Sequence, residues 1–287
     1  MSELTGYNVL ITGATGGLGR ALSAAFWNAG ANVLLAGRSP ELLEDLGQCL
    51  PPRAGQTIEQ IDCDLAQPCG PANLIGFVRG RWEWLDVLVD NAGTLGPVGP
   101  LWENDWDAWE AALRMNLLVP VQLCRGLIQM MGRRGSIINI SGGGATSPRP
   151  NFTAYAASKA ALVRFSETLA IEAAGRGVRV NCIAPGIMRT RMVEQVVELG
   201  AKLSGAQEYR KAQDVMERGG ISPGTPAELA VLLASERSQS ITGKLLSAAW
   251  DPWREAPGHA GELAASDIYT LRRIVPEDRG LNWGHSQ

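Results

Sequence analysis

Short apolar runs alternate with segments of helical periodicity along most of this chain. The apolar runs are five to seven residues long, the length of a strand that is buried on both faces of a sheet. They lie at residues 7–12, 31–36, 57–61, 85–89, 136–140, 178–183 and 241–247. Apolar residues recur at helical spacing in residues 20–28, 40–50, 71–81, 102–131, 151–174 and 226–237.

This alternation predicts an α/β fold with parallel strands and right-handed crossovers. We expect a Rossmann-like, doubly wound parallel sheet of about seven strands with helices on both faces, in a single domain at residues 1–250. Residues 187–226 follow a strand end and are less regular, which suggests a mobile substrate lid. Residues 251–287 are expected to be a C-terminal extension that packs on the domain or on a neighbouring subunit.

Composition and charge exclude several classes of protein. Of the 287 residues 45% are hydrophobic, and the net charge of −3 gives no reason to expect nucleic acid or a membrane surface as a partner. No apolar run reaches the ~18 residues of a membrane span, and the N-terminus lacks a secretory signal. Five scattered cysteines suggest reduced thiols in a cytoplasmic protein. His259 and His285 are the only histidines, so we expect neither histidine catalysis nor a metal site in the core.

A glycine-rich turn follows the first predicted strand and opens the first predicted helix. Glycines in that position allow a tight turn and let the backbone approach a pyrophosphate at a helix N-terminus. The candidate cofactor contacts in this turn are Gly13, Thr15, Gly17, Leu18 and Gly19.

The end of the second predicted strand bears on the choice of cofactor. Folds that bind NAD place an acidic residue about 20 positions after the glycines, whereas an arginine nearby accommodates the 2′-phosphate of NADP. Here Gly37 occupies the acidic position, and Arg38 and Ser39 follow it. We therefore expect NADP(H) to be favoured, with NAD(H) as the alternative; Arg38 as a solvated surface charge is the competing interpretation.

Two polar features stand out in the predicted helices. Tyr155 and Lys159 are four residues apart, so both project from one face of a helix, where the ammonium group would favour ionisation of the phenol. Asn116 lies among apolar residues of a long predicted helix, and such an amide needs a hydrogen-bond partner. Trp102, Trp106 and Trp109 form a stripe on that helix, which we expect to pack within the core or between subunits.

Taken together, these motifs resemble the short-chain dehydrogenase/reductase family in its compact single-domain branch, over residues 5–247. The resemblance implies catalytic roles for Tyr155 and Lys159 and a place for Asn116 in a proton relay. It also implies cofactor contacts from Asp64, Leu65, Asn91, Ala92, Gly93, Pro185, Gly186, Ile187 and Thr190, in addition to the glycine turn and the Tyr155–Lys159 pair.

The family's catalytic serine is the one motif that departs from the pattern. It usually lies thirteen residues before the tyrosine, and here that position is Gly142. Ser141, one residue earlier, is our candidate for the role, and Thr146 and Ser147 are the alternatives.

The resemblance implies an oxidoreductase that transfers a hydride between a nicotinamide and a small-molecule carbonyl or secondary alcohol. A 3-oxoacyl-type reductase and a sugar or polyol dehydrogenase both remain open, and a homodimer or homotetramer is expected. The alternative, which Gly142 favours, is a dinucleotide-binding regulatory or scaffold protein with weak or lost catalysis. Trp250 and Trp253 line the substrate pocket in one interpretation and belong to a surface-packed extension in the other.

Overall fold

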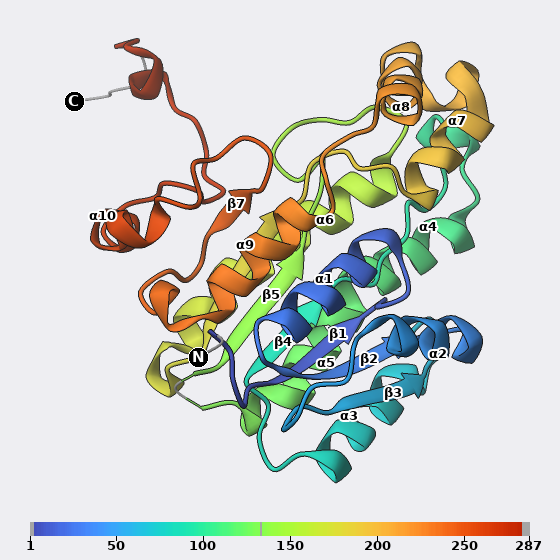
Figure 1. Ribbon diagram of the computed structural model, residues 1–287. Coiled ribbons are helices and arrows are strands. Elements are labelled where there is room, and N and C mark those ends of the chain that lie inside the picture. The colour runs from blue at the N-terminus through green and yellow to red at the C-terminus, as the bar shows by residue number, and fades with distance from the viewer. Residues whose placement is uncertain (1–2, 133, 283–287) are drawn as a thin grey trace.

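Parallel strands form one sheet in the computed structural model, which describes residues 3–132 and 134–282 (Figure 1). The strands are β1 (Asn8–Thr12), β2 (Asn32–Gly37), β3 (Ile58–Asp62), β4 (Val87–Asp90), β5 (Ser136–Ile140), β6 (Arg179–Ala184) and β7 (Leu245–Ser247). Their order across the seven-stranded sheet is β3-β2-β1-β4-β5-β6-β7, and every neighbouring pair is parallel. The predicted Rossmann-like fold is therefore confirmed.

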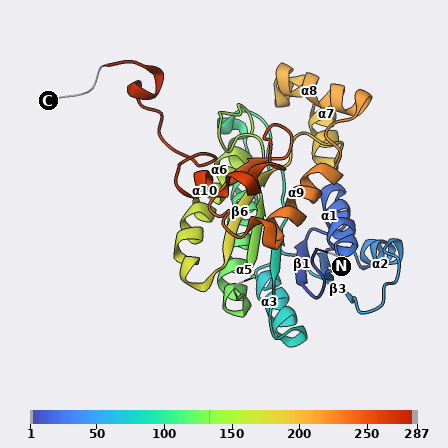
Figure 2. The same cartoon turned by 60° about the vertical axis from the view of Figure 1, so that its left-hand side comes forward.

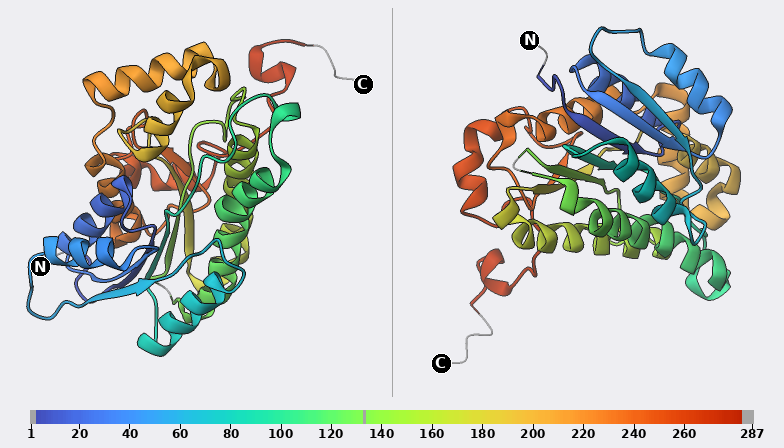
Figure 3. Two further views of the ribbon diagram at one scale, coloured as in Figure 1. Left: turned by 90° about the vertical axis from the view of Figure 1, so that its right-hand side faces the viewer. Right: turned by 90° about the horizontal axis from the view of Figure 1, so that it is seen from below.

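Helices cover both faces of the sheet, as Figure 3 shows in the view along the sheet's edge. The helices are α1 (Gly17–Asn28), α2 (Pro40–Cys49), α3 (Gly70–Arg81), α4 (Trp106–Leu113), α5 (Val119–Leu127), α6 (Thr153–Glu172), α7 (Arg191–Ser204), α8 (Ala206–Arg218), α9 (Gly224–Ala234) and α10 (Ala260–Ala264). One layer contains α1, α2 and α9, and the opposite layer contains α3, α5 and α6 (Figure 2). Both layers follow from strands whose two faces are apolar.

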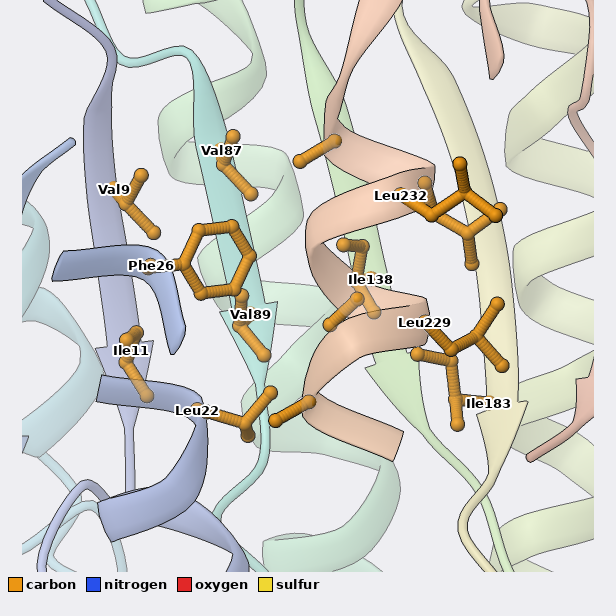
Figure 4. Close-up of a cluster of buried hydrophobic side chains, with 14 of the residues drawn as sticks. Val9, Ile11, Leu22, Phe26, Val87, Val89, Ile138, Ile183, Leu229 and Leu232 are labelled. Carbon is orange, nitrogen blue, oxygen red and sulfur yellow. The ribbon is translucent and has the colours of Figure 1, made fainter. Parts of the chain in front are cut away.

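Alternate residues of each strand feed two separate cores. Val9 and Ile11 of β1 pack with Phe26 of α1 on one side of the sheet (Figure 4). Leu10 points to the other side and packs in the cluster that contains Leu123 of α5. Because successive side chains of a strand point to opposite faces, a continuous apolar run fills both cores.

The final strand is shorter than predicted. Residues 241–247 were expected to be extended, but β7 covers only Leu245–Ser247. Before β7 the bonds to β6 are mixed. Gly243 N–H donates to Val180 C=O, but Val180 N–H donates to the hydroxyl of Thr242 and Lys244 N–H donates to the side chain of Asn181.

The long helix predicted at 102–131 is interrupted, and this corrects the sequence interpretation. A 3-10 turn, Leu101–Glu103, precedes α4, and a π-helical segment, Arg114–Leu118, joins α4 to α5. The tryptophan stripe is not in the core, because Trp102 and Trp106 are 84% and 65% exposed. Trp106 instead stacks on Trp109 with ring centroids 5.4 Å apart. Packing of the stripe between subunits stays a prediction.

The helical stretch Trp106–Met130 is long and apolar enough to cross a membrane when judged by length and composition alone. Core helices of globular proteins pass the same test, so this is weak evidence. Here Leu123, Cys124 and Leu127 of the stretch are buried in the core against the sheet.

Two segments lie outside the helix layers. In the predicted lid, α7 and α8 pack on each other beyond one end of the sheet (Figure 1). In the C-terminal extension, Trp253 is 4% exposed and belongs to the core on the α1 side, whereas Trp250 is 85% exposed. Leu245 N–H donates to Tyr269 C=O, so the extension also covers the outer edge of β7.

Arg179 of β6 links the sheet to the C-terminal end of α9, and this contact allows a prediction about stability. Its buried guanidinium donates to the carbonyls of Leu233, Ala234, Ser235 and Ser238 at the C-terminal end of α9. Arg179→Met removes these four charge-assisted bonds to buried carbonyls, so we expect the free energy of unfolding to fall by about 2–4 kcal/mol in urea titration. Arg176→Met is the control, because that exposed guanidinium donates only to Gln129. Equal stabilities of the two variants would contradict this account.

Candidate active site

The glycine turn lies where the strand order reverses, between β1 and β4. In open α/β sheets, this is the place where connections diverge to opposite faces and leave a crevice at the carboxyl ends of the strands. Gly13 has φ +61°, and a Cβ there would lie 2.9 Å from the Cα of Ala92. A Cβ on Gly19 would lie 2.1 Å from the carbonyl oxygen of Gly13. Both positions therefore require glycine.

The turn fits a diphosphate. The residue that caps α1 is Gly16, which has no side chain to compete for the N–H groups of the first helical turn, and that turn contains no acidic residue. These N–H groups and the helix dipole favour an anion. Gly17 and Thr190 are brought together, since a Cβ on Gly17 would lie 3.3 Å from the methyl group of Thr190. Thr15 of the glycine turn lies close to the end of β2, since its methyl group is 3.3 Å from a Cβ placed on Gly37.

Hydrogen bonds tie the ends of β1 and β4 into one unit. Thr12 donates its hydroxyl proton to Val89 C=O. The hydroxyl oxygen of Thr12 in turn accepts from the N–H groups of Asn91 and Ala92. The amide of Asn91 donates to the carbonyls of Thr12 and Gly13 at 2.9 and 3.0 Å. The segment Asn91–Gly93 is thereby held against the glycine turn.

Arg38, Ser39 and Asp64, three of the predicted cofactor contacts, lie just after the ends of β2 and β3. Arg38 is exposed, and Ser39 caps α2 by accepting from Leu42 N–H. Hydrogen bonds from Gln67 and Ala66 lower the pKa of Asp64, and the nearby charge of Arg38 adds to the effect. Arg38 and Asp64 therefore share this rim of the site.

The remaining predicted cofactor contacts divide by burial. Leu18 and Leu65 are packed in the two cores. Pro185 is buried, Gly186 turns the chain with φ +84°, and Ile187 is 46% exposed beside it.

Tyr155 and Lys159 lie on one face of α6, as predicted. Lys159 Nζ donates to Ile140 C=O at 2.7 Å and lies 5.9 Å from the centroid of the Tyr155 ring. Burial lowers the pKa of Lys159 to about 8, and Cys182 and Asp90 act against this shift. Burial raises the pKa of Tyr155, and the charge that opposes the shift comes from Arg149. In the chain alone, burial therefore outweighs the ionising effect that the sequence led us to expect from the lysine.

Asn116 has the partners that its buried position requires. It is fully buried in the π-helical segment; its Oδ1 accepts from Thr94 N–H, and its Nδ2 donates to Thr94 C=O and to Ser158 Oγ. Ser158 in turn donates to Tyr155 C=O at 2.8 Å. The amide thus joins the loop after β4 to the helix that carries Tyr155.

Gly142, rather than Ser141, faces the phenol. A Cβ on Gly142 would lie 2.1 Å from the hydroxyl oxygen of Tyr155. Ser141 continues the β5–β6 ladder by donating its N–H to Ile183, and its buried hydroxyl has no hydrogen-bond partner among the described residues. Thr146 and Ser147 are exposed. A catalytic role for Ser141 stays a prediction.

The lid covers Tyr155 with apolar side chains. Val196 and Met192 of α7 pack with Leu95 and Phe152 around the tyrosine. Next to this cluster, a cavity of 390 Å³ opens between the loop after β4 and α7. Its walls are Thr94, Leu95, Gly96, Pro97, Val98, Arg191, Gln195, Glu198 and Leu199.

One charged residue of the site was missed in the sequence. Arg149 belongs to the loop before α6, and its guanidinium carbon lies 5.4 Å from the centroid of the Tyr155 ring. A single arginine in a loop has no periodicity or spacing that could have identified it.

Cysteines and acidic residues give no further site. All five cysteines are free thiols, as expected. Within residues 3–132 and 134–282, no group of three or more His, Cys, Asp or Glu could hold a metal ion.

Comparison with known proteins places the chain in a family. The family model described as short chain dehydrogenase matches residues 7–199. The 3-oxoacyl-[acyl-carrier-protein] reductase FabG of Rickettsia felis is 34% identical over 86% of this chain and 96% of its own length. The D-beta-hydroxybutyrate dehydrogenase of Rhizobium meliloti is 30% identical over 83% of this chain and 95% of its own.

A solved structure agrees with these relatives. L-sorbose reductase from Gluconobacter frateurii, in complex with NADPH and L-sorbose, is 30% identical and superimposes with a TM-score of 0.75, covering 86% of this chain and 97% of that one. The chain therefore belongs to the short-chain dehydrogenase/reductase family and is an NAD(P)-dependent oxidoreductase that acts on CH–OH or carbonyl groups.

Proposed function

We propose that this oxidoreductase is an NADPH-preferring reductase of 3-oxoacyl-type carbonyls. The observation that carries the proposal is the apolar wall of the cavity next to the Tyr155 cluster, to which Leu95, Pro97, Val98 and Leu199 contribute. An aliphatic acyl chain gains free energy by covering such a wall, at about 25 cal/mol per Å² of apolar surface, whereas the hydroxyl groups of a sugar would lose their hydrogen bonds there. A reductase of keto sugars is the second candidate, supported by the similarity to L-sorbose reductase.

The chemistry follows from the positions of the side chains. Tyr155 is the general acid that donates its proton to the substrate oxygen, and it is the base in the reverse direction. Lys159, held by Ile140 C=O, places a positive charge near the phenol and would bind the ribose of the cofactor. Asn116 fixes the loop after β4 through its hydrogen bonds to Thr94, and this loop forms one wall of the cavity. A bound nicotinamide supplies the hydride.

Gly142 leaves the substrate oxygen without the serine hydroxyl that this family usually provides at that position. The intact arrangement of Tyr155, Lys159 and Asn116 supports catalysis over the alternative of a dinucleotide-binding regulator. We also propose a cytoplasmic location and a homodimer or homotetramer. The exposed side chains of Trp106 and Trp102, at the start of α4 and just before it, support the oligomer.

A substrate screen tests the function. We expect NADPH oxidation with 3-oxoacyl thioesters to show a kcat/KM at least about tenfold above that with keto sugars or simple ketones, rising with acyl length. Tyr155→Phe should lower kcat by about 100-fold or more while NADPH still binds, because the proton donor is lost. Tyr269→Phe, in the C-terminal extension, is the control. Faster turnover of keto sugars would favour the second candidate, and tight NADPH binding without any turnover would favour the regulator.

The cofactor preference has a separate test. Arg38 is exposed at the end of β2, next to Asp64, where a charge-assisted bond to the 2′-phosphate can form. In fluorescence titrations we expect NADPH to bind at least about tenfold more tightly than NADH, and Arg38→Asp to abolish most of this difference. Arg53→Asp makes the same charge change on an arginine that pairs with Asn28. Equal affinities for the two cofactors in the parent protein would overturn the preference.

A further prediction concerns the close contact between Gly142 and the Tyr155 hydroxyl. Gly142→Ala places a methyl group 2.1 Å from the Tyr155 hydroxyl, so the phenol must move away from its present position. We expect kcat to fall by about tenfold or more with little change in the melting temperature, because misplacing an acid is costly. Gly143→Ala is the matched control, since a Cβ there meets nothing within 4 Å. If both variants retain parental kcat, the phenol does not rest on Gly142 during reaction.

A further inference from the structure

Arg149 is placed to act on Tyr155 without touching the substrate oxygen. It lies in the loop between β5 and α6, and its guanidinium carbon stands 4.0 Å from the ring centroid of Phe152 and 5.4 Å from that of Tyr155. Its side chain is 21% exposed, so solvent screens its charge only partly. The loop therefore presents a fixed cation to the aromatic ring.

Glu208 of α8 holds this cation in place. Its Oε2 accepts from Nε and Nη2 of Arg149 at 2.9 and 2.7 Å, and its own side chain is 20% exposed. Burial acts to raise the pKa of Glu208, but Arg149 and Lys211 together outweigh it and the pKa is lowered, so the carboxylate is charged. Lys211 adds a second ion pair to Glu208 at 3.1 Å.

The same loop touches the joint between the two lid helices. Asn151 has the rare backbone φ of +69°, and its C=O accepts from Gly99 N–H. Its Nδ2 lies 3.3 Å from a Cβ placed on Gly205, the residue between α7 and α8. An ion pair and a close approach thus join the loop before α6 to the lid.

Few charges compete with Arg149 at the phenol. Among the described residues, the charged groups that face Tyr155 are Lys159 from α6 and Arg149 from the loop, with Glu208 and Lys211 behind Arg149. The neighbours from α7 and from the loop after β4 are apolar, and Gly142 contributes no hydroxyl. Burial raises the pKa of Tyr155, and Arg149 is the cation that opposes it.

We propose that Arg149 is a positioning residue that favours the ionised form of Tyr155, and that Glu208 on the lid fixes it there and tempers its charge. The inference rests on the proposed role of Tyr155 as the acid and base. It assigns a function to the lid beyond covering the pocket: the position of α8 sets the electrostatic surroundings of the phenol. A residue in this role acts in both reaction directions, since it changes the proton affinity of Tyr155 itself.

The test measures the pKa of Tyr155 directly rather than through enzyme activity. The chain has four tyrosines, so the ring carbon bonded to oxygen can be labelled with ¹³C and titrated by NMR in the full-length protein, with Tyr155→Phe assigning the signal. We expect Arg149→Met to raise the pKa of Tyr155 by about one pH unit and Arg149→Lys to restore most of it. Glu208→Gln, which removes the opposing charge but keeps an acceptor, should lower the pKa by roughly half a unit. Arg210→Met, also on α8, is the control.

Each outcome decides the proposal. Opposite shifts in the Arg149→Met and Glu208→Gln variants support it, and the pH profile of kcat should move in the same directions. A Tyr155 titration that changes by less than about 0.3 pH units in Arg149→Met overturns it, even if KM rises, because the pair would then only hold the lid. If Arg149→Met fails to fold, Glu208→Gln decides, since an upward shift there contradicts the proposed sign. Full activity of Tyr155→Phe would instead refute the proposed function while leaving the titration interpretable.

Discussion

The reversal of strand order between β1 and β4 is the constraint on which the rest of the structure depends. Parallel strands on either side of β1 send their connections to opposite faces, so the chain cannot close over the carboxyl ends of these two strands. Small polar groups link the carboxyl ends of β1 and β4 at this crevice. The hydroxyl of Thr12 and the amide of Asn91 satisfy the free backbone groups of both strand ends, and glycine is required where the two segments meet.

A second constraint is the burial of the reacting groups. Tyr155 and Lys159 are 8% and 4% exposed, and burial moves their pKa values in opposite directions, each toward the neutral form. Neutral forms suit a closed, dry pocket, whereas proton transfer needs the phenol to change its charge. Each cation near the phenol therefore matters more than it would at the surface, because the same charge acts through a lower effective dielectric constant.

Sequence periodicity predicted the elements that are buried on both sides, and local glycines predicted the cofactor turn, since both signals are local. The break in the predicted helix at 102–131 could not be predicted in this way. The π-helical segment there holds Asn116, whose amide bonds to Thr94, 22 residues earlier. Likewise, Trp102 and Trp106 have the spacing of a buried stripe, but in the described part of the chain they stay 84% and 65% exposed. The Arg149–Glu208 pair spans 59 residues, so only the folded lid reveals it.

Gly142 shows how the absence of a side chain can change which groups of a site act on the substrate. Where the family usually has a serine, this chain has the Tyr155 hydroxyl itself resting on the backbone. In the proposed reaction the phenol is the main group that polarises the substrate oxygen, so its proton affinity controls more of the reaction than it would where a serine shares the oxygen. That dependence gives a cation in the loop before α6 its importance. It also explains physically why the lid, which carries Glu208, bears on the chemistry as well as on access to the site.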